Sequence, residues 1–97
     1  MSTMNRQRAM DIMGSLWEII RDNVCILESC LEDFNKRQKP CCAIRKSAAK
    51  AVNAVQCSYY RFNKIAERYE YQDDYAIVNK TDALYKKSVD LSIFFGV

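Results

Sequence analysis

The first third of the chain carries apolar side chains at alternating spacings of three and four residues. This seam predicts an amphipathic helix over about residues 5–35. It consists of Met10, Met13, Trp17, Ile20, Val24, Leu27, Leu31 and Phe34. A second stripe with the same alternation consists of Ile12, Leu16, Ile19, Asn23, Ile26 and Cys30. Because it lies next to the first, the apolar face spans about 150° of the helix, more than one neighbouring helix covers.

A break follows at residues 35–40, where Pro40 pushes the preceding residue out of helical geometry and itself suits a first helical position. The pattern then predicts a second helix over about residues 40–71. Its apolar face consists of Cys41, Ile44, Ala48, Ala51, Val55, Ser58, Phe62, Ile65 and Tyr69, widened by Val52, Tyr59 and Ala66. A loop this short predicts that the two helices pack as an antiparallel hairpin.

The periodicity lapses at residues 71–74, where Asp73 and Asp74 are candidate N-caps for a third helix over about residues 75–95. Gly96 is its expected C-terminal stop. Alternatively, Thr81 begins a shorter helix after an extended segment over residues 75–78. Only two glycines and one proline occur in the chain, too few for the turns of a many-stranded sheet.

We therefore predict one all-α domain over residues 1–97, in which an antiparallel helical hairpin and a third helix form a three-helix bundle. Helices of some thirty residues are about 45 Å long, which is elongated for a chain of this size. This length and the wide apolar face favour association through the long amphipathic helices, as a homodimer. The alternative is a monomeric bundle with a well-covered core.

The sequence has few motifs that could support catalysis or bind a cofactor or a metal ion. The chain has no histidine, no glycine-rich phosphate loop and no nucleophile with a recognisable base, which argues against an enzyme, a cofactor or a metal. Five cysteines in a chain with no signal peptide or transmembrane pattern favour reduced thiols and a cytoplasmic location. The alternatives are a zinc site and a disulfide from Cys30 to Cys41 or Cys42.

Charge is distributed unevenly along the chain. Residues 1–35 have a net charge of −3, residues 36–68 of +8, and the remainder of −2. In a helical projection Lys46, Lys50, Arg61, Lys64 and Arg68 form one basic stripe opposite the apolar face of the second helix. This stripe either contacts phosphate or pairs with the acidic outer sides of the other helices, within the chain or across a dimer.

Two functions fit these patterns. The first is a non-enzymatic adaptor, regulator or inhibitor that binds a protein partner. Its candidate contact residues are Leu16, Ile19, Ile26, Tyr60, Phe94 and Phe95. The alternative is a sequence-tolerant nucleic-acid-binding protein, similar in outline to nucleoid-compacting histone-like proteins. Its candidate contact residues are Lys36, Arg37, Lys39, Arg45, Lys46, Lys50, Arg61, Lys64 and Arg68.

Overall fold

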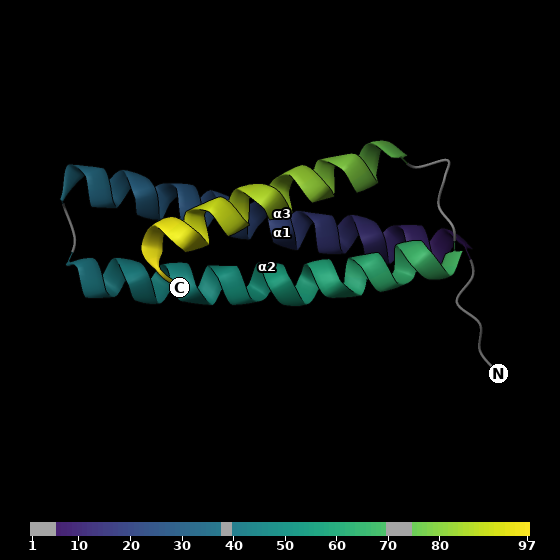
Figure 1. Ribbon diagram of the computed structural model, residues 1–97. Coiled ribbons are helices and arrows are strands. Elements are labelled where there is room, and N and C mark those ends of the chain that lie inside the picture. Colours follow the sequence, from purple (N-terminus) through teal and green to yellow (C-terminus); the bar gives the residue numbers. More distant parts are fainter. Residues whose placement is uncertain (1–5, 38–39, 70–74) are drawn as a thin grey trace.

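The computed structural model describes residues 6–37, 40–69 and 75–97, and these form three helices. Helices α1 (Arg6–Lys36) and α2 (Cys41–Tyr69) run antiparallel as a hairpin, and α3 (Tyr75–Phe95) crosses one face of it (Figure 1). The C-terminal end of α3 comes to lie near the loop end of the hairpin. The predicted all-α three-helix bundle is confirmed, with each predicted helix boundary within two residues of the observed one.

The core follows the hairpin as three consecutive clusters. Phe62 packs with Met13 and Leu16 near the start of α1, and Val55 packs with Ile20 and Val24 in the middle. Near the loop, Leu27 and Cys30 pack with the first turns of α2 and with Leu91 and Phe95 of α3. All the members of this last cluster are buried: Leu27, Cys30, Ile44, Ala48, Ala51, Val52, Leu91 and Phe95.

The buried side of α1 differs from the predicted seam, because it runs between the two apolar stripes. Leu16 and Cys30 of the second stripe are buried, whereas Trp17 of the first is half-buried and Phe34 is 40% exposed. The reason is that α2 and α3 pack against α1 from two sides. The interpretation of Leu16 as a surface contact is therefore wrong: it is 4% exposed and packs in the core with Phe62.

Helix α3 buries hydroxyl groups where its apolar pattern is interrupted. Thr81 and Ser88 are buried, and their hydroxyls donate to the carbonyl oxygens of Ile77 (2.7 Å) and Tyr85 (2.6 Å) in the preceding turn. Since each buried hydroxyl has a partner within its own helix, it requires none from the hairpin. The helix is continuous through Thr81, so the alternative of an extended segment before this residue is wrong.

Two helix ends have well-defined geometry. Helix α1 is followed by Arg37 in a left-handed conformation (φ 54°), and the Arg37 amide donates to the Phe34 carbonyl oxygen at 3.2 Å. Gly96 (φ 70°) ends α3 in a Schellman motif, in which the amides of Gly96 and Val97 donate to the carbonyl oxygens of Ile93 and Ser92. This confirms Gly96 as the stop, while the candidate caps Asp73 and Asp74 lie outside the described residues.

The bundle is elongated. Its principal extents are 51 × 25 × 17 Å, and its radius of gyration is 15.3 Å, compared with about 13 Å for a compact domain of about 100 residues. The long axis is that of the hairpin, so a large share of both long helices lies at the surface.

Candidate protein-binding surfaces

Exposed large apolar side chains gather at the end of the bundle that holds the hairpin loop. We name Phe34, Ile93, Phe94 and Val97 the end cluster; Ile93 is 74% exposed and Phe94 is 54% exposed. The ring of Phe94 meets that of Phe34 edge to face, with centroids 5.4 Å apart. This contact joins the last turn of α1 to the last turn of α3, and the rings therefore hold each other in place.

Phe95 lies beneath the end cluster and not in it. It is 6% exposed and packs with Leu27 and Ile44, while its ring edge contacts Phe94 with a centroid separation of 5.1 Å. The interpretation of Phe95 as a contact residue is therefore wrong, because a side chain at this position of α3 points into the hairpin. Phe94, its neighbour, is turned outward and is exposed as predicted.

A hollow of about 430 Å³ adjoins the end cluster and includes one of its residues. It is lined by Phe34, Arg37, Pro40, Cys41 and Ile44. Arg37 is exposed at this hollow, and a guanidinium nitrogen of Arg45 lies 3.6 Å from the position that a Cβ would take on Gly96. The apolar end is therefore accompanied by two cationic side chains.

A second apolar surface lies on the hairpin away from α3. We name this surface the open face; it consists of Ile19 and Ile26 of α1 with Ser47 and Ala54 of α2. Ile19 is 43% exposed and Ile26 is 46% exposed, as predicted for contact residues on an outer surface. Ile26 and Ser47 line one groove of about 430 Å³ between the helices, and the half-buried Ala54 continues the α2 side at helical spacing.

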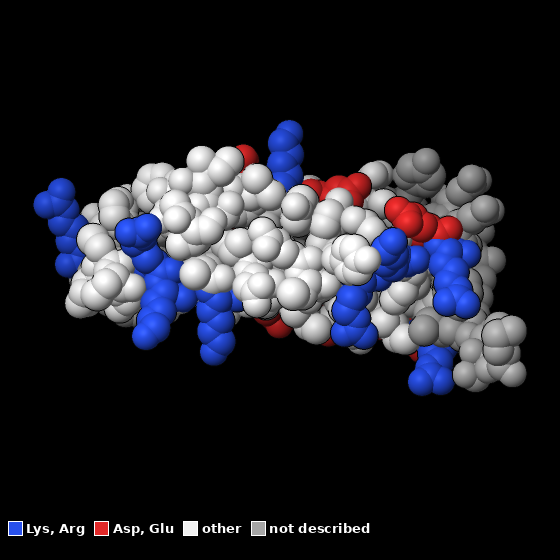
Figure 2. All heavy atoms as spheres, turned by 60° about the horizontal axis from the view of Figure 1, so that its bottom comes forward, with Lys and Arg blue, Asp and Glu red and all other residues white. Residues whose placement is uncertain are grey.

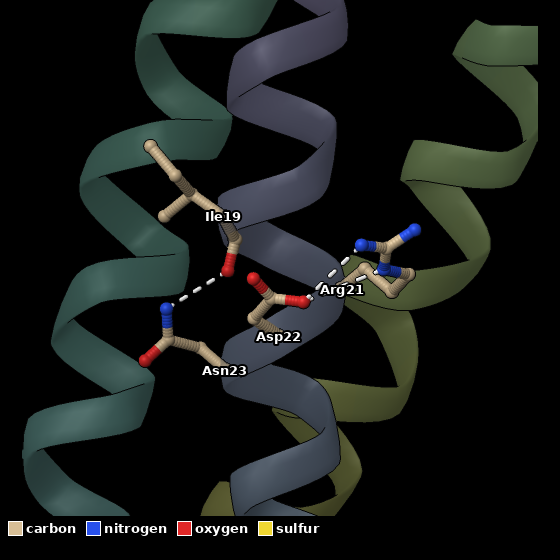
Figure 3. A network of polar contacts seen from close by, with 4 residues as sticks. All are labelled: Ile19, Arg21, Asp22 and Asn23. Atoms are coloured by element: carbon tan, nitrogen blue, oxygen red, sulfur yellow. Dashed lines mark hydrogen bonds and ion pairs between the residues drawn. The ribbon is translucent and has the colours of Figure 1, made fainter.

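The polar side chain between the two isoleucines is turned back onto its own helix. Asn23 Nδ2 donates to the Ile19 carbonyl oxygen at 2.8 Å. Figure 3 shows Ile19 and Asn23 on the side of α1 that borders α2, while Arg21 extends on the α3 side, where it bonds Asp22 at 3.4 Å. The Nδ2 group of Asn23 would thus keep this hydrogen bond within the chain when a partner covers the face.

Tyr60 is exposed, as predicted for a contact residue, but it belongs to neither apolar surface. It is 64% exposed on the outer side of α2, and the Lys64 ammonium lies 5.4 Å from its ring centroid. Tyr59 points the other way and stacks on Tyr85 of α3.

The predicted basic stripe lies at the surface of α2 in two groups. Lys46 and Lys50 form one group and Arg61, Lys64 and Arg68 the other, and the further contact candidate Arg45 precedes the first group. All six are exposed, and residues 51–60 carry no charge. Figure 2 shows the corresponding blue side chains toward both ends of this side of the molecule, with an uncharged area between. Of the loop candidates, Arg37 is exposed, Lys36 bonds Glu32 at 2.6 Å, and Lys39 lies outside the described residues.

Most of this stripe is not neutralised within the chain. Among the described residues, Arg45, Lys46, Lys50, Arg61 and Lys64 form no ion pair. The ion pairs of the described segments that we identify lie elsewhere, within α1 and between Lys87 of α3 and Glu28 of α1, at 2.9 Å. Pairing of these five cations with the acidic sides of α1 and α3 of the same chain is therefore not observed.

The cysteines form neither of the alternative sites in the structure. None of the five cysteines forms a disulfide; Cys30 is buried, and Cys25, Cys41, Cys42 and Cys57 are exposed. Within residues 6–37, 40–69 and 75–97, no three cysteine or acidic side chains come together in a way that could hold a metal ion.

No helix in the described segments is both long and apolar enough to cross a membrane. Comparisons with protein-family models, with curated proteins and with solved structures found no match for this chain.

Proposed function

We propose that this chain is a non-enzymatic protein-binding module that acts in the cytoplasm as an adaptor, regulator or inhibitor. The observation that supports this function best is the end cluster. Phe34 of α1, Ile93 and Phe94 of α3, and Val97 just beyond α3 are all exposed there, and an exposed apolar patch of this kind is typical of a binding surface. The absence of a disulfide among the five cysteines agrees with a reducing compartment.

The chemistry around the end cluster indicates what kind of partner fits. The rings of Phe34 and Phe94 could contact an apolar side chain of the partner, which would act as its anchor. The adjoining hollow is large enough for one such side chain. Arg37 and Arg45 lie beside the apolar end, so carboxylates flanking the anchor would gain charge-assisted contacts. We therefore expect a protein segment with an apolar anchor and acidic neighbours.

The test uses a photo-crosslinking amino acid at position 94, with the same amino acid at Asn79, an exposed position elsewhere on α3, as the matched control. A partner crosslinked from position 94 and not from 79 is identified and purified, and its affinity is measured against wild type and Phe94→Asp. We expect the substitution to weaken binding about 100-fold or more, because it places a carboxylate at the centre of the contact. A partner that binds Phe94→Asp as tightly as wild type contradicts the proposal.

Nucleic-acid binding is the second candidate, and the unpaired cations on α2 favour it. Contact with phosphates through the basic stripe would give an affinity that falls steeply with salt and depends little on sequence. A labelled duplex is titrated at about 50 and 200 mM salt with wild type and with Lys46→Glu/Lys64→Glu. Binding that is absent at the lower salt concentration, or unchanged in the double variant, eliminates this candidate.

A further inference from the structure

The open face carries an isoleucine ridge on α1. Ile12, Ile19 and Ile26 are seven residues apart, so they form one row along the helix. Ile12 is half-buried, while Ile19 and Ile26 project. Asn23, which lies between them, is hydrogen-bonded to the Ile19 carbonyl oxygen. The ridge is therefore a regular row of apolar side chains, and Asn23 is held back against its own helix instead of projecting between them.

Helix α2 carries a row of small residues on the same face. In helical packing, a knob enters a hole formed by residues i, i+3, i+4 and i+7 of the facing helix. Two successive holes on α2 have small side chains at most corners. The first consists of Ser47, Lys50, Ala51 and Ala54, and the second of Ala54, Cys57, Ser58 and Arg61. One corner of each hole, Ala51 or Ser58, is buried on the side toward the hairpin core. These holes are seven residues apart, the same spacing as the knobs.

Contacts inside the hairpin show which knob is level with which hole. Leu27 packs with Ala51, and Leu16 packs with Phe62. By interpolation, Ile26 lies level with the first hole and Ile19 with the second. Knobs and holes therefore occur at matching heights on one face of one chain, which is what a symmetric contact between two copies requires.

Charge selects the orientation of such a contact. The sequence of α1 holds four basic and six acidic residues, and that of α2 holds six basic and one acidic residue. A two-fold axis perpendicular to the helices would place α1 on α1 and α2 on α2, and so like charge on like charge. A two-fold axis parallel to the helices preserves the height of every residue and places acidic α1 of one copy on basic α2 of the other.

We propose that the open face binds a second copy of this chain, with α1 of each copy packed antiparallel on α2 of its partner. In this dimer Ile19 and Ile26 enter the two holes of the partner, and the unpaired Lys50 and Arg61 border an acidic helix. The two helices of one copy, each about 45 Å long and about 10 Å wide, together offer on the order of 900 Å², comparable with the roughly 800 Å² per partner of a stable interface. The inference does not rest on the end cluster, which stays accessible.

The first test measures the mass of the full chain by sedimentation equilibrium across protein concentrations. We expect a monomer–dimer equilibrium and a dissociation constant at least 100-fold larger for Ile19→Lys/Ile26→Lys, because both lysines would face a basic helix. Ile93→Lys, an exposed isoleucine of the end cluster, is the matched control and should dimerise as wild type does. Unchanged helical circular dichroism in the double variant shows that it is folded.

The second test determines orientation by disulfide crosslinking. In a background where the exposed cysteines are serine and Cys30 is alanine, Ile26→Cys and Ala54→Cys are made in separate chains with different tags. Mixing them under oxidation should give the mixed disulfide in excess over either self-crosslink, because position 26 lies over position 54 of the partner. A dominant crosslink between two copies of Ile26→Cys would overturn the orientation.

Three results would overturn the dimer itself. These are a wild-type monomer at millimolar concentration, a dimer that Ile19→Lys/Ile26→Lys leaves intact, and a monomer that binds a labelled duplex through Lys50 and Arg61. The last outcome would assign the basic border of the open face to nucleic acid. Loss of dimerisation in the double variant with normal crosslinking from position 94 would separate this inference from the proposed function of the end cluster.

Discussion

Tyr59 of α2 and Tyr85 of α3 stack face to face, with ring centroids 3.9 Å apart and an angle of 10° between their planes. The Tyr59 hydroxyl also donates to Asp82 Oδ1 at 2.7 Å, one turn before Tyr85. Helix α3 has a weak apolar face because Thr81 and Ser88 occupy two of its buried positions. The stacked pair and its hydrogen bond therefore form a specific attachment of α3 to the hairpin.

Substitutions at Tyr59 should separate these two contributions. Tyr59→Phe keeps the stack and removes the hydrogen bond, so we expect a loss of about 1 kcal/mol in the free energy of unfolding. Tyr59→Ala removes both and should cost about 2–3 kcal/mol. Urea denaturation followed by Trp17 fluorescence measures both values. The exposed Tyr60 provides the control: Tyr60→Phe should change stability by less than about 0.5 kcal/mol.

The stability contributed by Tyr59 should depend on alkaline pH. Burial raises the pKa of Tyr59 above its usual value of 10.0, and the hydrogen bond to Asp82 raises it further. Because the folded pKa exceeds the unfolded one, the stabilisation is complete below about pH 10 and is lost as the pH rises through the raised value. The stability advantage of wild type over Tyr59→Phe should therefore shrink above pH 10. An advantage that stays constant from pH 8 to pH 11 would contradict this expectation.

The sequence pattern predicted the hairpin core well, because both long helices are buried along one side at helical spacing. Val55 and Phe62 are fully buried where the alternation of three and four residues puts them. Helix α1 holds exceptions: Leu16 and Cys30 of the second stripe are buried, and Phe34 of the first is exposed. Two adjoining stripes on α1 fit the helical period equally well, and only the position of α3 decides which members of each are covered.

Local hydrogen bonding explains why two polar side chains of α3 are buried. Thr81 and Ser88 interrupt the apolar pattern of α3, yet both are buried because their hydroxyls bond to the preceding turn. The end cluster was only partly predictable. Phe94 was expected at the surface, but its contact with Phe34 depends on the direction in which α3 crosses the hairpin, which periodicity does not determine.

Replacing one phenylalanine of the core and one of the end cluster by alanine should lower the free energy of unfolding by very different amounts. Phe62 is fully buried against Met13 and Leu16, so we expect Phe62→Ala to cost about 3–5 kcal/mol, the usual range for a buried phenylalanine. Phe94→Ala should cost less than about 1 kcal/mol, because the ring is 54% exposed and lies on the outside of its ring contacts with Phe34 and Phe95. Thermal and urea denaturation measure the pair. Equal losses would mean that Phe94 is a structural residue, and would weaken its assignment to a binding surface.

Arg37 offers a way to stabilise the hairpin loop. It has φ 54°, a left-handed conformation that costs a residue with a Cβ about 1–2 kcal/mol and that glycine adopts freely. Arg37→Gly relieves this cost but makes the unfolded chain more flexible, so we expect a net gain of about 0.5–1 kcal/mol. Arg37→Ala is the matched control, since it removes the same charge and keeps the Cβ; it should give no gain. If both variants changed stability equally, the effect would come from the guanidinium group and not from the backbone conformation after α1.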